Sequence, residues 1–356
     1  MKIILSALTL LLISAALPDA GFDDLPLNRV QLIGSHNSYK QAIDPGLFAL
    51  LKEKNPDAAR ALEYGHVSLS EQLSLGLRNL EIDVYADEKG GKYSHPKGLT
   101  WGGSHPPYDP DGEMNKPGFK VFHVQEIDFR SNCPTFAGCL KELKAWSDQH
   151  KDHYPVYVTM NAKDEVIKDH PEFTVPEKFT AAVFDRLDKE ILEYLGRDYV
   201  ITPDDIRGNY PSLENAVLSG HWPTMGQARG KFIFILDEKG EHFDSYIKGH
   251  PSLKDRVLFA DAPAGTPEAA FMILNDPQKE EEAAHIREMV RKGYMVRTRA
   301  DADTEEARRN DKSRFKAACH SGAQIITTDY YYKSRFFSSE YTVKFDDGSY
   351  MRKDIF

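Results

Sequence analysis

Cysteine is scarce in this sequence, with three residues in a chain of 356. This number excludes a small domain held together by several disulfides, and it excludes a zinc site made of four cysteines. Positive charge is also in deficit, because 45 Lys and Arg face 55 Asp and Glu and leave a net charge of -10. Such an acidic chain is poorly suited to general nucleic-acid binding, or to docking on an anionic bilayer by charge alone.

Nucleotide-binding signatures and internal repeats are also missing. The sequence has no G-x-x-x-x-G-K-[ST] motif, and its first predicted strand leads into Gly-Ser-His-Asn rather than into a dinucleotide fingerprint. With 41% hydrophobic and 28% charged residues, the composition is that of an ordinary globular protein. The length fits one large barrel or two modest domains.

Past the N-terminus, no segment is long and apolar enough to span a membrane. Lys2 precedes an apolar run over 3–17, which is followed by small residues, as in a secretory signal peptide. We predict a signal peptide over 1–20, cleaved near Ala16 or Ala20, and an exported mature chain over 21–356 that is secreted or periplasmic. A buried or anchoring N-terminal helix is the alternative.

Export would permit a disulfide. Cys133 and Cys139 are close in sequence, and Pro134 and Gly138 between them favour a turn that would bring the two thiols together. We predict a Cys133–Cys139 disulfide, with two reduced core thiols as the alternative. Cys319 is left over inside a helical pattern and is expected to be a small buried residue.

Short apolar runs alternate with helical patterns along the chain. Some runs, such as 232–236, are apolar throughout, which is typical of parallel strands covered on both faces. Eight such runs predict a single (β/α)8 TIM barrel, and a doubly wound open sheet is the alternative. The expected strands cover 30–34, 77–84, 120–124, 156–160, 231–236, 270–274, 295–298 and 325–328.

Three helices are expected from their apolar periodicity and capping residues. The first is bounded by a capping box at Thr174 and Glu177 and by Gly196. The second begins at Asp276-Pro277 and ends at Gly293, and the third covers about 312–320.

The connection over 85–118 holds seven glycines and five prolines and has no helical period. It predicts a long loop between the second and third strands. A functional lid and a plain surface excursion are both compatible with this composition. As a lid it would contact membranes locally, through Tyr93, Trp101 and Tyr108, because Trp and Tyr suit the membrane interface.

Polar residues gather at the predicted carboxyl ends of the strands, where barrel enzymes place their active sites. The first strand ends at His36 and Asn37, the second carries Glu81 and Asp83 on one face, and the third ends at His123. The other strand ends add Asn161, Lys163, Arg297, Arg299, Asp301, Asp329 and Tyr330.

These residue types suit cleavage of a phosphodiester. Amide and carboxylate oxygens without cysteines favour Ca²⁺ or Mg²⁺ over zinc. Two histidines would serve as general base and general acid, and the cations would hold an anionic substrate.

Several stretches are similar to known barrel phosphodiesterases. GSHNSY over 34–39, LEIDV over 80–84 and FHV over 122–124 resemble the superfamily of phosphatidylinositol-specific phospholipase C. VRTRAD over 296–301, the stretch from GAQI at 322–325 through Asp329-Tyr330, and the two close cysteines narrow the resemblance to the bacterial calcium-dependent phosphoinositide phospholipase C family. The similarity covers about 28–333.

The resemblance implies a distorted barrel, one Ca²⁺ and a histidine pair, His36 and His123, that flanks the phosphate. Asn37, Glu81 and Asp83 match the metal ligands or their immediate partners.

The fourth strand departs from the family pattern. Asn161 stands where such enzymes usually place a glutamate, two residues before the matching Lys163. It keeps a carbonyl oxygen but removes one negative charge, which should weaken calcium binding. Lys163, Arg299, Asp329 and Tyr330 would lie on the substrate side, and a rim salt bridge is the alternative role for Arg299 and Asp329.

The implied mechanism is attack by a substrate hydroxyl on the neighbouring phosphorus, with calcium bound to that hydroxyl and to a phosphate oxygen. His36 would stabilise charge or assist deprotonation, although Glu81 or Asp83 competes with it for the role of base. His123 would protonate the leaving alkoxide, giving a cyclic phosphate and a diacylglycerol-like alcohol. The expected partner is a phospholipid or other phosphodiester, with transient membrane contact, no nucleic acid and a monomeric protein.

Three other functions remain open. A glycerophosphodiesterase-like enzyme would use the same barrel, although such enzymes usually carry His-Arg-Gly where this chain has His36-Asn37-Ser38. Asn161 favours a barrel that binds a phosphorylated ligand without turnover. A carbohydrate-binding barrel would use Trp101 and the tyrosines as a platform, and the two histidines argue against it.

Overall fold

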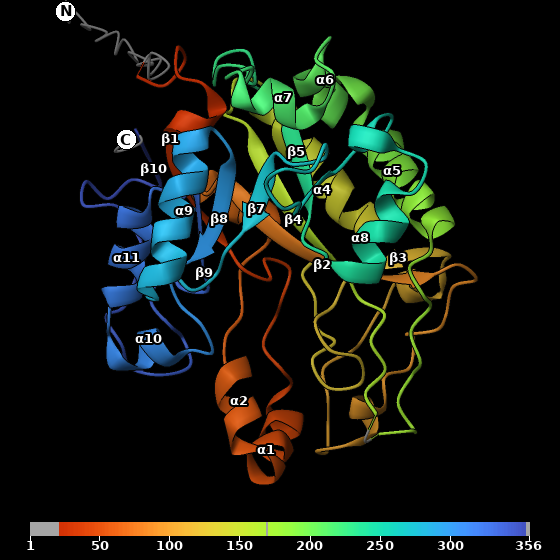
Figure 1. Ribbon diagram of the computed structural model, residues 1–356. Helices are drawn as coiled ribbons and strands as arrows, with labels where there is room; N and C mark the ends of the chain where they lie inside the picture. Colours follow the sequence, from red (N-terminus) through yellow and green to blue (C-terminus); the bar gives the residue numbers. More distant parts are fainter. Residues whose placement is uncertain (1–20, 169, 354–356) are drawn as a thin grey trace, which may run out of the picture.

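The computed structural model describes residues 21–168 and 170–353, so the predicted signal peptide lies outside the described residues. Eight parallel strands form a nearly closed barrel in the order β6-β5-β4-β2-β1-β9-β8-β7, and β6 and β7 meet at the bridge between Asp261 and Phe271 (Figure 1). The predicted (β/α)8 architecture is confirmed. The barrel strands are β1 (Val30–Ser35), β2 (Asn79–Asp87), β4 (Val156–Ala162), β5 (Phe232–Leu236), β6 (Phe259–Ala260), β7 (Phe271–Ile273), β8 (Met295–Arg299) and β9 (Ile325–Thr328).

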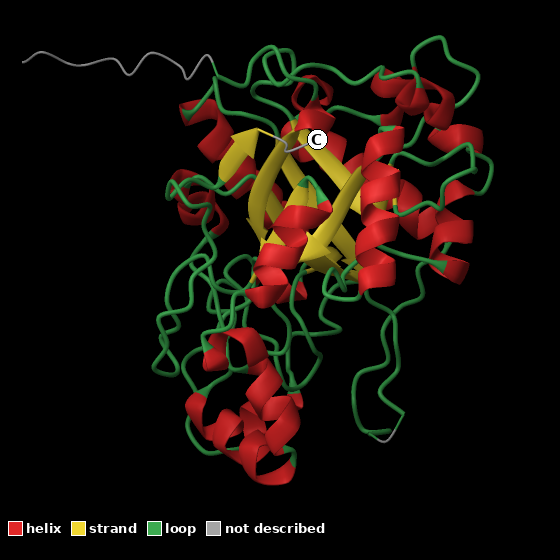
Figure 2. Ribbon diagram, turned by 60° about the vertical axis from the view of Figure 1, so that its left-hand side comes forward, coloured by secondary structure: helices red, strands yellow, loops and turns green. Residues whose placement is uncertain are grey.

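Helices surround the barrel, and α1 and α2 project beyond the carboxyl ends of the strands (Figures 1 and 2). The region over 261–270, between β6 and β7, is described throughout and contains no helix. The helices are α1 (Pro45–Lys54), α2 (Pro56–Leu62), α3 (Leu69–Leu75), α4 (Phe136–Gln149), α5 (Ala181–Leu195), α6 (Pro203–Arg207), α7 (Leu213–Leu218), α8 (Gly240–Ile247), α9 (Glu280–Lys292), α10 (Glu305–Arg309) and α11 (Ser313–Ser321).

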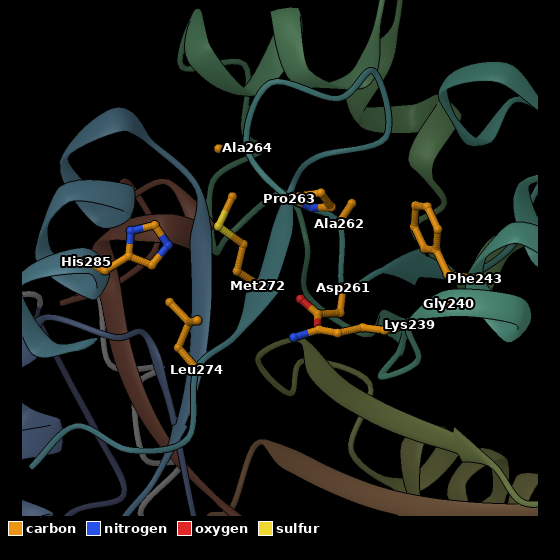
Figure 3. Close-up of a pocket in the computed structure, with 10 residues that line it drawn as sticks. All are labelled: Lys239, Gly240, Phe243, Asp261, Ala262, Pro263, Ala264, Met272, Leu274 and His285. Atoms are coloured by element: carbon orange, nitrogen blue, oxygen red, sulfur yellow. The ribbon is translucent and has the colours of Figure 1, made fainter. Parts of the chain in front are cut away.

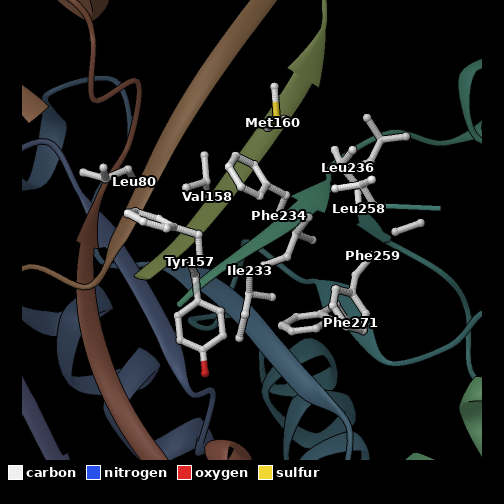
Figure 4. Close-up of a cluster of buried hydrophobic side chains, with 14 of the residues drawn as sticks. Leu80, Tyr157, Val158, Met160, Ile233, Phe234, Leu236, Leu258, Phe259 and Phe271 are labelled. Atoms are coloured by element: carbon white, nitrogen blue, oxygen red, sulfur yellow. The ribbon is translucent and has the colours of Figure 1, made fainter. Parts of the chain in front are cut away.

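The main core lies inside the barrel and between its strands and the helices. β4 and β5 pair in parallel, so that Val158 lies beside Phe234, and both side chains are fully buried (Figure 4). The strands read as unbroken apolar runs because side chains fill the barrel on one face and helices cover the other. None of the helices in 21–168 and 170–353 is long and apolar enough to cross a membrane.

One predicted barrel strand is wrong. The segment predicted over 120–124 contributes only to β3 (Gly118–Lys120), which pairs antiparallel with the end of β2 and lies outside the barrel. β10 (Met351–Lys353) is likewise an antiparallel addition, beside β1. The eighth barrel position belongs to β6, whose two residues are too short a run for the sequence pattern to reveal.

Two predicted helix starts are also wrong. α5 begins at Ala181, because Thr174 and Glu177 are engaged in contacts between loops: the Glu177 carboxylate accepts a hydrogen bond from the backbone N–H of Glu88 at 3.0 Å. α9 begins at Glu280, not at Asp276-Pro277. The predicted glycine ends of both helices are confirmed, and α11 agrees with prediction within one residue.

The predicted disulfide is present. Cys133 and Cys139 are bonded, with their Cα atoms 5.2 Å apart, at the start of α4. The side chain of Thr135 caps this helix by accepting the Gly138 N–H at 3.2 Å. Cys319 is a buried free thiol, as expected.

The long loops after β1, β2 and β4 extend beyond the same rim of the barrel (Figures 1 and 2). Glu126 ties two of them together, since its carboxylate accepts the backbone N–H of Lys97 at 2.6 Å and that of Thr174 at 2.8 Å. The predicted aromatic contact surface is wrong in part. Tyr93 is buried within the loop, and Tyr108 is partly buried against Phe129.

Candidate active site

His36 is the first residue after β1, and its backbone N–H donates to the carbonyl of Thr328 in β9 at 3.1 Å. The imidazole Nδ1 lies 2.9 Å from Oδ1 of Asp329, and we assign the ring proton to this nitrogen because a carboxylate accepts. Arg299 Nη2 lies 3.3 Å from the same nitrogen. Burial, reinforced by the charge of Arg299, holds the pKa of His36 well below its usual value, so the ring is neutral near pH 7. Its other nitrogen, Nε2, faces Oε1 of Glu81 at 3.5 Å.

Asp329 lies behind His36, between the Arg299 guanidinium and the ring of His66, whose pKa burial lowers to about 4. Arg299 Nη2 lies 3.6 Å from Oδ2 of this carboxylate, and His66 Nε2 lies 3.8 Å from Oδ1. Burial raises the pKa of Asp329, and the Arg299 charge counteracts that rise. The salt bridge between Arg299 and Asp329, given above as the alternative to substrate binding, therefore exists, and the same carboxylate contacts His36.

Asp301 holds the backbone of Asp329 in place. Its Oδ1 accepts the backbone N–H of Asp329 at 2.9 Å, and its burial raises its pKa to about 7. Tyr330, predicted to bind substrate, is instead a core residue whose ring packs against Phe337 and Tyr341. Neighbouring residues of an extended chain point to opposite sides, and the Asp329 carboxylate points toward His36 instead.

His123 lies just beyond β3 (Gly118–Lys120). Its Nδ1–H donates to Oδ2 of Asp128 at 2.8 Å, and the same carboxylate oxygen lies 3.3 Å from Nζ of the fully buried Lys40. The hydroxyl of Tyr85 donates to the His123 carbonyl at 3.0 Å and holds the backbone in place. No sequence pattern pointed to Asp128 or Lys40.

The four predicted metal ligands come from the ends of β1, β2 and β4. The two carboxylates have cationic partners: Glu81 pairs with Arg297, and Asp83 Oδ2 lies 3.6 Å from Nζ of Lys163. The two amides donate hydrogen bonds, from Asn37 Nδ2 to the Tyr64 hydroxyl at 2.8 Å and from Asn161 Nδ2 to the Asp237 carbonyl at 2.9 Å.

Within 21–168 and 170–353, no group of three or more His, Cys, Asp or Glu side chains is arranged to hold a metal ion. The chemistry of the predicted donor set still fits calcium. It consists of two carboxylates and two amides, whose oxygens are the ligands that this ion prefers. Asp83 and Asn161 are direct neighbours in the pairing of β2 with β4.

A polar cavity of about 400 Å³ opens beside this donor set and is lined by Asn161, Lys163, Lys239 and His242 among others. A second cavity, of about 600 Å³, lies on the barrel flank between α8 and α9 (Figure 3). Its lining is mainly apolar, as with Met272 and Leu274, and Lys239 borders both cavities. The reactive groups described above lie at the rim and not in this flank cavity.

The fold is a (β/α)8 barrel whose rim carries two histidines, each in contact with an aspartate. Residues 25–354 match the sequence model of the family described as phosphoinositide phospholipase C, Ca²⁺-dependent. The chain belongs to this family, whose members are phosphoric diester hydrolases. A comparison with curated protein sequences found no match.

Solved structures share this fold at low sequence identity. A calcium-dependent phosphoinositol-specific phospholipase C from Pseudomonas sp, in its apo form with myoinositol, has a TM-score of 0.56 and 14% identity, over 94% of this chain and 97% of that one. A Ca²⁺-dependent phosphatidylinositol-specific phospholipase C from Streptomyces antibioticus has a TM-score of 0.55 and 18% identity, over 86% and 95%.

Proposed function

We propose that this chain is an exported phosphodiesterase that cleaves a phosphoinositide-type phosphodiester through a cyclic phosphate and releases diacylglycerol. The observation that carries the proposal is a pair of histidine–aspartate contacts at one barrel mouth. His36 gives its Nδ1–H to Asp329 and His123 gives its Nδ1–H to Asp128. In each ring Nε2 is left for the reaction.

His36 acts on the attacking side of the reaction. Its lowered pKa keeps the ring neutral, so Nε2 holds a lone pair that accepts the proton of the substrate hydroxyl. Asp329 and its hydrogen bond then stabilise the imidazolium that forms, and they fix the tautomer of the resting ring.

His123 acts on the leaving side. Asp128 orients its ring, and a proton on Nε2 passes to the alkoxide oxygen as the bond to phosphorus breaks. Arg299 and Lys163, at the ends of β8 and β4, attract the phosphate to the mouth.

Asn37, Glu81, Asp83 and Asn161 would hold calcium, which when bound neutralises negative charge on the phosphate oxygens. Residues 1–20, with the composition of a signal peptide, support export.

A panel of phosphodiesters assayed with the full mature chain tests the proposal. The panel contains phosphatidylinositol vesicles, a soluble inositol phosphodiester and glycerophosphodiesters, each with calcium and with chelator. We expect a cyclic inositol phosphate from the first two, and loss of turnover in the His36→Ala variant. Turnover confined to glycerophosphodiesters would identify a glycerophosphodiesterase-like enzyme instead. Binding of inositol phosphate without any turnover would identify a barrel that binds a phosphorylated ligand.

A further inference from the structure

Lys163 makes a contact that its predicted role as a substrate ligand does not explain. It follows β4, and its ammonium lies 3.6 Å from Oδ2 of Asp83, one of the four calcium donors proposed above. A lysine side chain is an ammonium at neutral pH. A cation therefore stands at a carboxylate that a calcium ion would need.

The second cation of the donor set is fixed in place. Arg297 is buried, its Nη1 donates to Oδ1 of Asn275 at 2.8 Å, and its Nη2 donates to Glu81. This planar group with two anchors cannot leave Glu81 without losing several contacts at once.

Lys163 is held far more loosely than Arg297. Its side chain is 32% exposed, whereas that of Asp83 is 4% exposed. A lysine ammonium is a point charge on a flexible stem, so it can move between neighbouring anions without reorganising the barrel. The polar cavity that Lys163 lines provides the space for that movement.

Because Asn161 is uncharged, Lys163 and a calcium ion would compete for the carboxylate of Asp83. Asn161 and Asp83 are paired neighbours on β4 and β2, and Asn161 contributes no charge. Asp83 is thus the one carboxylate at this position of the sheet that either Lys163 or a divalent ion can neutralise. Two cations close to one carboxylate repel each other, so occupancy by the ion disfavours the lysine contact.

We infer that Lys163 is an exchangeable cation, which pairs with Asp83 when calcium is absent and is released toward the substrate phosphate when calcium binds. The inference rests on the proposed function, because that function supplies both the ion and the phosphate. It makes calcium binding and phosphate binding mutually favourable, and by linkage each ligand raises the affinity for the other by the same factor. Glu165 and Glu238 line the same polar cavity as Lys163, so their carboxylates are alternative partners for the released ammonium.

Calorimetric titration of the full mature chain with Ca²⁺, with and without saturating inositol 1-phosphate, measures this coupling directly. In the wild type we expect the phosphate to tighten calcium binding by roughly 5- to 10-fold, within the usual range of coupling between sites. Lys163→Met should bind calcium more tightly than wild type in the absence of phosphate, and its affinity should not respond to inositol 1-phosphate.

Two further variants serve as controls. Lys163→Arg keeps the charge and should preserve competition for Asp83. Lys178→Met removes a lysine of the same loop that pairs with Asp164 at 3.2 Å, and it should match wild type in both titrations. A circular dichroism spectrum and a thermal melt show whether each variant is folded.

Weaker or unchanged calcium affinity in folded Lys163→Met would overturn the inference. The inference would also fail if inositol 1-phosphate did not change the calcium affinity of wild type, or if it still raised the calcium affinity of Lys163→Met. An absence of calcium binding in both proteins would overturn it as well. These titrations do not measure turnover. A protein that shows the expected coupling but cleaves no phosphodiester would refute the proposed function and leave the exchange of Lys163 standing.

Discussion

His36 and Asp329 are separated by 293 positions in the sequence, and yet the Nδ1–H of the histidine donates to the carboxylate at 2.9 Å. The contact follows from the closure of the barrel. β1 and β9 pair in parallel, with Ser35 beside Thr328, so the next residue of each strand emerges at the same point of the rim. The first and last βα units thereby bring together two residues of the proposed active site.

We expect Asp329→Asn to lower turnover by roughly 10²–10⁴-fold, the range typical of lost acid–base assistance. An amide carries no charge to stabilise the imidazolium, and it can hold His36 in the wrong tautomer. Turnover of a phosphatidylinositol substrate, with folding checked by circular dichroism, measures the effect. Asp347→Asn, at an exposed position in the C-terminal tail, is the control and should behave as wild type. Near-normal activity of Asp329→Asn would remove this carboxylate from the mechanism.

His123→Ala should separate substrates by their leaving groups. An alkoxide needs a proton as it departs, whereas a nitrophenolate leaves without one, so the variant should lose far more activity on the natural alkoxide than on the nitrophenyl ester. His36→Ala should damage both reactions, because it acts on the attacking side. Turnover of both variants on both substrates checks the assignment. Equal losses for His123→Ala on the two leaving groups would show that His123 is not the general acid.

The part of the site that follows long strands could be predicted from the sequence. His36, Glu81 and Asp83 lie on or directly after β1 and β2. The apolar runs of these strands predict where each residue lies and to which side of the strand its side chain points. Arg299, the last residue of β8, and Asp329, the first residue after β9, could be predicted in the same way.

Features made by tertiary contacts could not be predicted. β6 has two residues and leaves no period to detect. The sequence pattern predicts His123 on a barrel strand, whereas the structure places it before a tight turn in which Val124 pairs with Asp128. This turn brings the Asp128 carboxylate to the ring of His123. The predicted start of α5 at Thr174 is wrong for a related reason: loops use the same hydrogen-bond donors and acceptors as helix ends.

Loss of the Cys133–Cys139 disulfide should lower the free energy of unfolding by about 2 kcal/mol, as the chain-entropy model gives for so short a loop. The bond restricts the unfolded chain at the start of α4. Urea unfolding of Cys133→Ala/Cys139→Ala, compared with wild type, measures the change. A reductant should destabilise wild type to a similar extent and leave the double variant unaffected, and equal stability of oxidised wild type and variant would contradict the prediction.

The last prediction concerns pH and the loop after β4. His242 in α8 lies between two carboxylates, with Nδ1 2.8 Å from Glu238 and Nε2 3.0 Å from Asp164. The hydrogen bond to Glu238, with help from Asp164, raises the pKa of His242 to about 9, although burial opposes the rise. In the unfolded chain the same group titrates near pH 6.5. The folded state therefore binds the proton more tightly than the unfolded state does.

Its contribution to stability is complete below about pH 6.5 and is lost as the pH rises to about 9. We expect His242→Gln to be less stable than wild type at pH 6, and the difference in the free energy of unfolding to shrink steadily by pH 9.5. Urea titrations at four pH values test this, with His320→Gln, an exposed histidine in α11, as the matched control. A difference that stays constant with pH would mean that the ring contributes packing alone, and one that grows with pH would reverse the sign of the proposed linkage.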